Sequence, residues 1–367
     1  MSSVNSVGAG GFRPLKVVDK RRECSTITSL HLEPVNPADW RDFEPGQFLN
    51  FKLPAGKAQP DVLRNYSVSS APGQRGRYRI TVKRETEGIG SGYLHDQAAV
   101  GSVLLADGPR GAFCLDRTST RAVLLLSGGV GLTPLVSMLH TLAAHGERRA
   151  VFIHACDNGA VHALGPEVRA LAASRPGIEA HVVYRFPTDA DRTAAAHQAE
   201  GVISRELLQQ LLPLDDYECY LCGPPAFMQA MFGLLRGLGV AQERIAYEFF
   251  GPATVLESGA TAPSPAAPPV APPQPALAPA AADGITVAFG KSGRSVNWSE
   301  DAQSLLALAE SHGLRPPFSC RAGVCGSCKT GLLAGEVSYF EEPLDDPGAG
   351  QVLICCARPK SSLVLDL

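Results

Sequence analysis

The sequence predicts a multidomain fold: an antiparallel β-barrel, an α/β domain with a parallel sheet, and a small α+β domain. Short alternating strands fill residues 12–116, and continuous apolar strands alternate with helices over 117–256. An Ala/Pro-rich stretch, 257–283, then separates these parts from 284–367. At roughly 100–200 residues per domain, the 367 residues have room for three such domains.

The barrel is expected from short strands that are broken by Pro and Gly, for example Gly46–Leu53 and Arg77–Lys83. Within the second of these, Tyr78, Ile80 and Val82 should face one side and the intervening polar residues the other. Many short strands with regular turn signals favour an antiparallel barrel.

The texture changes after residue 120. Ala122–Leu126 is a continuous apolar run, followed by glycines and by Leu135–Leu142 at helical spacing. Similar runs recur at 150–154 and 179–184. Strands that are apolar on both faces and alternate with helices indicate a parallel sheet covered by helices.

The stretch 257–283 separates the C-terminal domain from the rest. It carries no charge from Ser258 to Ala282, and its prolines favour an extended, semi-rigid tether, although a passive spacer fits the composition equally well. Beyond it we expect short strands and one helix near Asp301–His312, with Ser299 as its N-cap.

Charge and composition exclude some function classes. The net charge of −3 argues against nucleic acid as a partner, and no apolar run approaches the ~20 residues of a membrane helix. The first eleven residues lack the apolar core of a secretory signal. Ten cysteines, five of them after residue 319, point to a metal site in a reducing compartment, so we expect a cytoplasmic protein.

The clustered cysteines follow a specific spacing. Cys320, Cys325 and Cys328 are separated by four and by two residues, and Cys355 follows later. Thiolates hold iron–sulfur clusters, and this is the plant-type 2Fe–2S spacing. A structural zinc site or fortuitously buried cysteines are the alternatives, but zinc usually takes paired CxxC motifs and only one lies within this C-terminal cluster.

Glycines and a proline complete this motif. Gly323 and Gly326 let the loop curl so that backbone N–H groups can point at the sulfurs. The segments CRAGVCGSCKTG and VLICCARP resemble the C-terminal ferredoxin domain of ferredoxin-fused reductases, which implies a β-grasp fold. In that family the last ligand precedes a proline by four, which selects Cys355; Cys356 would be a backup ligand or a packed neighbour.

A second motif, Arg64-Asn65-Tyr66-Ser67, combines groups that a flavin nucleotide needs: a cation for the pyrophosphate, a flat side chain and a hydroxyl. Alone it is weak, because Arg and Tyr on a strand are usually surface and core residues. With two further segments it resembles the flavin domain of ferredoxin–NADP reductase-like enzymes, in particular the reductase half of flavohaemoglobins. That resemblance implies FAD rather than FMN, bound by Arg64, Tyr66, Ser67, Val82, Lys83, Gly88 and Ser91, with Ser67 catalytic.

The third motif, Ser127 to Pro134, directly follows an apolar strand. Glycines let a backbone approach a pyrophosphate, and the next helix N-terminus favours its charge, although such a turn can also be purely structural. It resembles the GGxGxTP pyridine-nucleotide turn of the same family. The resemblance implies that the coenzyme is bound by Gly128, Gly129, Gly131 and Thr133.

Two segments near the end of the α/β domain extend the resemblance. Cys222, with Gly223 and Pro224, matches the family's cysteine beside the nicotinamide; a buried cysteine before a turn is the alternative. The segment 247–252 resembles the flavohaemoglobin C-terminus. It implies that Phe250 covers the flavin and that Glu248 lies near the nicotinamide, both as catalytic residues.

These motifs together imply an NAD(P)H oxidoreductase. Electrons would pass from NADH or NADPH through FAD and a 2Fe–2S cluster to a partner redox protein, because flavin accepts pairs and releases single electrons. A Rieske-type oxygenase or demethylase is the expected acceptor. A hybrid-cluster-protein reductase, an electron-storage or regulatory protein, and a flavin-less nucleotide-binding scaffold are alternatives. Arg185 could hold a 2′-phosphate or lie in solvent, and we favour NADH.

Overall fold

The computed structural model describes residues 11–55, 61–145 and 147–250, then 285–299, 302, 304–314, 316–318, 323, 326, 328–340, 343 and 346–367. The chain divides into two compact units, Met1–Gly251 and Pro252–Leu367. The Ala/Pro-rich stretch 257–283 lies outside the described residues. Among the described helices, none has the length and apolarity that a membrane crossing requires.

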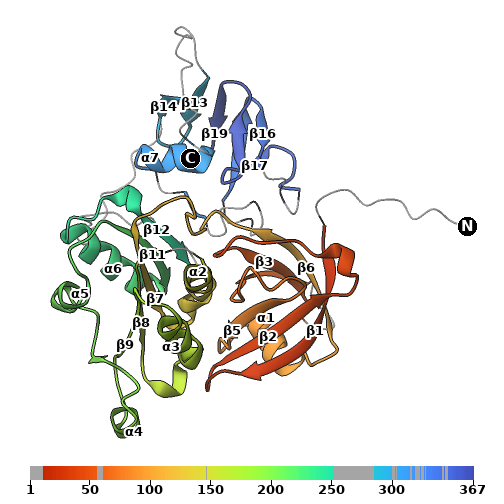
Figure 1. The fold of residues 1–367 in the computed structure, drawn as a ribbon. Coiled ribbons are helices and arrows are strands. Elements are labelled where there is room, and N and C mark those ends of the chain that lie inside the picture. Colours follow the sequence, from red (N-terminus) through yellow and green to blue (C-terminus); the bar gives the residue numbers. More distant parts are fainter. Residues whose placement is uncertain are drawn as a thin grey trace, which may run out of the picture. The chain divides into compact units, whose positions relative to one another are not determined.

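The first part of the unit Met1–Gly251 is a six-stranded antiparallel sheet with the order β4-β3-β6-β1-β2-β5 (Figure 1). A bridge between Val68 and Ile80 joins its two ends, which closes the expected barrel. Its elements are β1 (Arg13–Arg22), β2 (Ile27–Pro34), η1 (Pro37–Asp39), β3 (Phe48–Leu53), β4 (Val62–Ser67), β5 (Tyr78–Lys83), α1 (Ile89–Asp96) and β6 (Val103–Arg110).

Strand β5 places Tyr78, Ile80 and Val82 in the barrel core. Arg79 and Thr81, which alternate with them, are absent from that core cluster but are buried as well. The Ser69 hydroxyl lies 2.8 Å from the Thr81 hydroxyl and accepts a hydrogen bond from the Arg79 Nε.

The second part is an all-parallel sheet with the order β10-β9-β8-β7-β11-β12, as predicted. Helices α2 and α3 pack between this sheet and the barrel (Figure 1). The elements are β7 (Ala122–Gly128), η2 (Gly129–Gly131), α2 (Leu132–Ala144), β8 (Ala150–Cys156), η3 (Gly159–Val161), α3 (Gly165–Ser174), β9 (Ile178–Tyr184), α4 (Asp189–Thr193), β10 (Ala199–Glu200), α5 (Arg205–Leu211), β11 (Tyr217–Gly223), α6 (Pro225–Gly237), η4 (Gln242–Arg244) and β12 (Ile245–Phe249).

A buried ionic group joins the barrel to the α/β domain. The Arg79 guanidinium donates to both carboxylate oxygens of Glu167 on α3, at 2.6 and 2.8 Å. His140 on α2 contacts the same carboxylate at 2.6 Å. Burial raises the pKa of Glu167, but the hydrogen bonds from His140 and Arg79 outweigh it and lower the pKa to about 2. The barrel and the α/β domain are therefore joined by a shared ionic group.

The described part of the second unit contains a five-stranded sheet with the order β14-β13-β19-β15-β17, a two-stranded sheet and one helix, which is the predicted α+β fold. The helix begins at Leu305 rather than near Asp301, because Ser304, not Ser299, caps it by accepting from the Ala307 N–H. The elements are β13 (Thr286–Phe289), β14 (Arg294–Asn297), α7 (Leu305–Ser311), β15 (Lys329–Ala334), β16 (Val337–Tyr339), β17 (Gln351–Leu353), β18 (Ala357–Pro359) and β19 (Leu363–Leu365).

Candidate flavin, nicotinamide and cluster sites

Strand β4 presents the first two candidate flavin residues on one face, since Arg64 and Tyr66 are two positions apart. The Tyr66 ring packs at 5.9 Å from Phe51, and burial raises the pKa of its phenol to about 12. Helix α1 comes close here: a Cβ at Gly90 would lie 2.7 Å from the Arg64 Cγ and 3.3 Å from the Tyr66 hydroxyl. The cation, the flat ring and the start of a helix therefore meet at one place. Ser67 is buried at the last position of the strand.

The turn from Gly88 to Ser91 opens helix α1. Gly88 is the N-cap and provides no side chain, so the first-turn N–H groups keep their capacity for an outside anion. The Ser91 hydroxyl accepts from the Glu85 N–H and donates to the Gly88 carbonyl, both at 3.2 Å, which fixes the turn. In β5, the Val82 carbonyl is contacted by the His95 ring at 2.8 Å, and Lys83 forms an exposed ion pair with Glu85.

The glycine turn after β7 is built on backbone contact. A Cβ at Gly131 would lie 2.2 Å from the Cys222 carbonyl oxygen, so no larger residue fits there. Gly129 has a φ of +54°, which disfavours a side chain. The Thr133 hydroxyl donates to the Val130 carbonyl at 3.2 Å at the start of α2. The turn also contacts β5 of the barrel, which brings these candidate coenzyme residues next to a strand with candidate flavin residues.

Phe227, which the sequence did not single out, covers this turn. Its ring atoms would lie 2.8 Å from a Cβ at Gly128 and 2.7 Å from one at Gly223. Both glycines are needed because the ring rests on their bare backbone. A lone aromatic residue in the first turn of α6 has no sequence signal that distinguishes it from an ordinary core residue.

Three side-chain positions meet at the ends of β11 and β12. Cys222 is fully buried and is the register partner of Glu248 in the neighbouring strand. Burial, with Glu248 nearby, raises the pKa of the Cys222 thiol well above its usual value, so this thiol stays protonated. Phe250 packs against the core of the α/β domain, and Phe249 is buried. The exposed Pro224 begins the turn into α6.

An ion pair lies at the ends of β8 and β9. The Arg185 guanidinium contacts the Asp157 carboxylate at 2.8 Å, with both side chains about half exposed. Arg185 also lies over the Phe186 ring, 4.7 Å from its centroid. The cation that the sequence offered for a 2′-phosphate is thus already paired with a carboxylate.

In the second unit, the described residues of the cysteine motif include two buried cysteines and two glycines with positive φ. Cys328 and Cys355 are buried, whereas Cys320 and Cys325 lie outside the described residues. Gly323 and Gly326 have φ values of +68° and +70°. The Gly323 N–H points at the Cys355 sulfur, 3.4 Å away, as predicted for a ligand thiolate.

Cys356 occupies a different environment. Its thiol donates to the Leu353 carbonyl at 3.4 Å, and it is completely buried. A Cβ on Gly323 would come within 2.7 Å of its sulfur. A backbone N–H is directed at the Cys355 sulfur, whereas the Cys356 thiol donates to a backbone carbonyl. The environment of Cys355 therefore fits a cluster ligand better than that of Cys356.

Comparison with known families matches each part of the chain. The oxidoreductase FAD-binding domain matches residues 14–114, and the oxidoreductase NAD-binding domain matches residues 125–232. The 2Fe-2S iron-sulfur cluster binding domain matches residues 288–360.

Among curated proteins, flavohemoproteins of Bordetella pertussis and Bacillus anthracis are 42% and 40% identical over 251 and 252 residues. These matches cover 66% and 67% of this chain and 62% of each relative, so the chain spans about three-fifths of their length.

Two solved structures are similar over different extents. The FAD/NAD-binding domain of nitric oxide dioxygenase from Vibrio cholerae is 33% identical, with a TM-score of 0.59; the match covers 66% of this chain and all of that one. Phthalate dioxygenase reductase is 26% identical, with a TM-score of 0.57, over 97% of this chain and 98% of that one.

The fold and these sites define an NAD(P)H oxidoreductase that uses FAD and a 2Fe–2S cluster. More particularly, the chain belongs to the ferredoxin–NADP reductase-like flavin oxidoreductases, with a reductase part similar to that of flavohaemoglobins and a C-terminal 2Fe–2S ferredoxin domain.

Proposed function

We propose that this protein is the reductase component of a multicomponent system and passes electrons from NADH to a partner protein, a Rieske-type oxygenase or demethylase. The observation that carries the proposal is the order of parts: flavin, nicotinamide and 2Fe–2S domains in one chain, matched along 97% of its length by phthalate dioxygenase reductase. The domains are proposed to span 12–116, 117–256 and 284–367, joined by 257–283.

The residues of the barrel are proposed to hold and orient the flavin. Bound FAD supplies the conversion between paired and single electrons. Arg64 and the N–H groups after Gly88 offer charge-assisted hydrogen bonds to its phosphates. Tyr66 offers a flat ring that stays neutral, because its pKa is about 12. Ser67, Val82, Lys83 and Ser91 complete the proposed set.

The residues of the α/β edge are proposed to hold the coenzyme. The glycine turn of Gly128, Gly129 and Gly131, followed by Thr133, lets a pyrophosphate approach the backbone and the amino end of α2. The protonated Cys222 thiol forms an uncharged wall for the nicotinamide, flanked by Gly223 and Pro224. Glu248 and Phe250 are proposed to contact the nicotinamide and the flavin.

We propose NADH as the donor rather than NADPH. The carboxylate of Asp157 pairs with Arg185, which neutralises this cation and places a negative charge where a 2′-phosphate would need the opposite. Among the described residues no two cysteines are joined by a disulfide, which agrees with the proposed cytoplasmic location.

Four cysteines are proposed to hold the cluster: Cys320, Cys325, Cys328 and Cys355. Adjacent residues provide a matched pair of variants. In Cys355→Ser the plant-type absorption and the paramagnetic iron signal after anaerobic addition of NADH should be lost or strongly altered. In Cys356→Ser both should persist, because its sulfur bonds to Leu353. Loss in the second variant and retention in the first would reverse the assignment.

The partner class is tested by coupled turnover. NADH oxidation should be slow alone, fast with an artificial one-electron acceptor, and productive with a Rieske-type oxygenase from the same source. Fast reduction of the artificial acceptor without productive coupling to any oxygenase would retain the reductase and reject this acceptor. No paramagnetic iron after NADH addition to the intact wild-type holoprotein would reject the electron path itself.

A further inference from the structure

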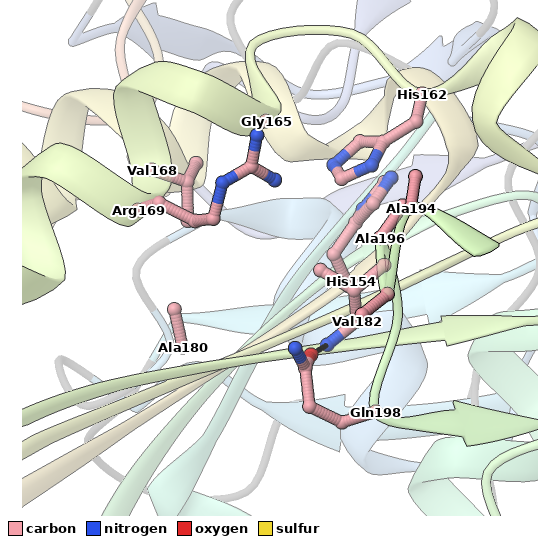
Figure 2. A pocket seen from close by; sticks show the side chains of 11 residues that line it. His154, His162, Gly165, Val168, Arg169, Ala180, Val182, Ala194, Ala196 and Gln198 are labelled. Atoms are coloured by element: carbon pink, nitrogen blue, oxygen red, sulfur yellow. Dashed lines mark hydrogen bonds between the residues drawn. The ribbon is translucent and has the colours of Figure 1, made fainter. Parts of the chain in front are cut away.

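The α/β domain contains a cavity of about 270 Å³ that none of the residues assigned to the coenzyme lines. It lies over β8 and β9, beneath the first turns of α3 and the segment 194–198 (Figure 2). Its apolar floor is formed by Ala180 and Val182, and its polar wall by His154, His162, Arg169 and Gln198. A few polar groups above an apolar floor are typical of a small-molecule site.

A buried polar atom in this cavity lacks a partner. His154 is 2% exposed, and its Nδ1 shares a hydrogen bond with the Ser127 hydroxyl at 2.8 Å. Its Nε2 contacts no hydrogen-bonding group in the described part of the chain. Buried polar atoms are rarely left without a partner, because their desolvation then goes uncompensated. A ligand in the cavity would supply the missing hydrogen bond.

The charge of the lining is positive. Arg169 is the one charged residue that lines the cavity, and Figure 2 shows its side chain reaching along it toward the two histidine rings. Within the described residues it makes no hydrogen bond or ion pair. A nearby carboxylate, Asp191, does not line the cavity, and it accepts from Thr188 and from the Gly159 N–H. The cation therefore has no counter-ion there.

The start of α3 adds donors on the same side. Gly165 is the first residue of this ten-residue helix and lines the cavity, and no side chain caps the helix. The amino end of a helix carries a partial positive charge and unbonded N–H groups, which favour anions. In the first turn of α3 only Gly165 and Glu167 can supply such N–H groups, because Pro166 has none and the Val168 N–H donates to the Leu164 carbonyl. Two described non-glycine residues have a positive φ: Ala195, at +47°, lines the cavity, and Leu164, at +55°, directly precedes Gly165. Such strain concentrates at ligand-binding sites.

The two histidine rings are held in place. They stack with centroids 4.9 Å apart, and His162 Nδ1 lies 2.8 Å from the Tyr184 hydroxyl. Burial, followed by the repulsion of Arg169, lowers the pKa of His162 to about 4. Burial also lowers the pKa of His154 well below its usual value. Both rings are neutral near pH 7, so Arg169 and the helix end supply the positive charge.

We propose that this cavity binds a phosphate group, either inorganic phosphate or that of a small phosphorylated metabolite, between Arg169, the two histidines and the amino end of α3. An arginine fork and helix N–H groups match the geometry and the double charge of phosphate. The cavity has room for more than the phosphate itself, which leaves space for an organic part over Ala180 and Val182.

The test is a titration of the FAD-loaded full chain with inorganic phosphate and, separately, with glycerol 3-phosphate. The chemical shifts of the labelled histidine rings report on His154 and His162. Both rings should shift with a saturable dependence in the wild type. Arg169→Gln should weaken binding at least tenfold. Arg205→Gln removes an exposed arginine at the start of α5 and should bind as the wild type does.

A second variant keeps the test independent of charge. Ala196→Leu narrows the cavity and should also weaken binding, with NADH oxidation unchanged. Tighter binding of glycerol 3-phosphate than of phosphate would identify a phosphorylated metabolite, and equal binding would identify phosphate itself. Rings that do not shift up to about 50 mM of either compound, or an unchanged affinity in Arg169→Gln, would overturn the proposal.

Discussion

The barrel and the α/β domain differ in what their proposed nucleotide sites are made of. The barrel offers side chains: Arg64 and Tyr66 project from β4 against helix α1. The α/β domain offers bare backbone: at Gly128, Gly131 and Gly223 a single added carbon would strike a neighbour. A conservative substitution in a site made of side chains retains part of the interaction, whereas any added side chain in a site made of bare backbone displaces a neighbour.

If coenzyme binding depends on close approach to bare backbone, Gly131→Ala should slow NADH-dependent reduction more than the other substitutions slow or weaken their own steps. The new Cβ would lie 2.2 Å from the Cys222 carbonyl, and rigid backbone on both sides must move. We expect NADH-dependent reduction to fall about a hundredfold, because small misplacements cost that much in rate. Stopped-flow kinetics would measure it, with flavin content unchanged.

Gly233→Ala is the matched control, because a Cβ there, within α6, meets nothing within 4 Å. It should leave the rate unchanged. A mild effect of Gly131→Ala would show that the turn can adjust to a side chain. The proposed contrast between the flavin site and the coenzyme site would then not hold.

If side chains carry the flavin site, Arg64→Ala should weaken FAD binding about ten- to a hundredfold, since hydrogen bonds to charged groups are worth about 1.5–3 kcal/mol. The FAD affinity of Arg64→Lys should lie between those of the wild type and Arg64→Ala, because a point charge replaces the planar guanidinium. Flavin release on dilution measures the effect. Arg21→Ala, which removes an exposed arginine paired with Asp19, serves as control and should bind FAD normally.

The joint between the two domains can be tested through Glu167. Glu167→Gln should lower the free energy of unfolding at pH 7 by about 3 kcal/mol, because it leaves Arg79 buried beside a neutral group. Glu33→Gln breaks the exposed pair with Arg77 and should cost less than about 1 kcal/mol. Urea unfolding measures both.

The same variant gives a pH dependence with a definite sign. The pKa of Glu167 lies at about 2 in the folded protein, below its ordinary 4.5. Its stabilisation is therefore complete above pH 4.5 and is lost as the pH falls toward 2. The difference in stability between wild type and Glu167→Gln should shrink over this interval. A constant difference would show that the carboxylate charge does not stabilise the joint.

The smallest expected effect concerns coenzyme choice. Asp157→Asn would release Arg185 from its ion pair, and the preference for NADH over NADPH should fall about tenfold, or 1.4 kcal/mol. Arg185→Ala should not improve NADPH use. The ratio of kcat/KM for NADH to that for NADPH measures this preference. Asp189→Asn, which changes a fully exposed carboxylate paired with Arg192, is the control. An unchanged ratio would remove Asp157 from coenzyme selection.

The sequence alone indicated the order and class of the domains and most of the candidate site residues. Strand periodicity, apolar runs and cysteine spacing are local properties, and each is read within a few tens of residues. The glycines of the coenzyme turn and of the cysteine loop could be predicted because a missing side chain is visible in the sequence.

The tertiary structure alone decided which residues meet across elements. Periodicity predicted the side of the strand on which Arg79 lies but not its burial or its ion pair with Glu167 of the second domain. Phe227 over the glycines, Asp157 beside Arg185, and the cavity around His154 join residues from separate strands and helices. Such contacts depend on how the layers pack, and since packing is non-local and specific in shape, no short stretch of sequence encodes it.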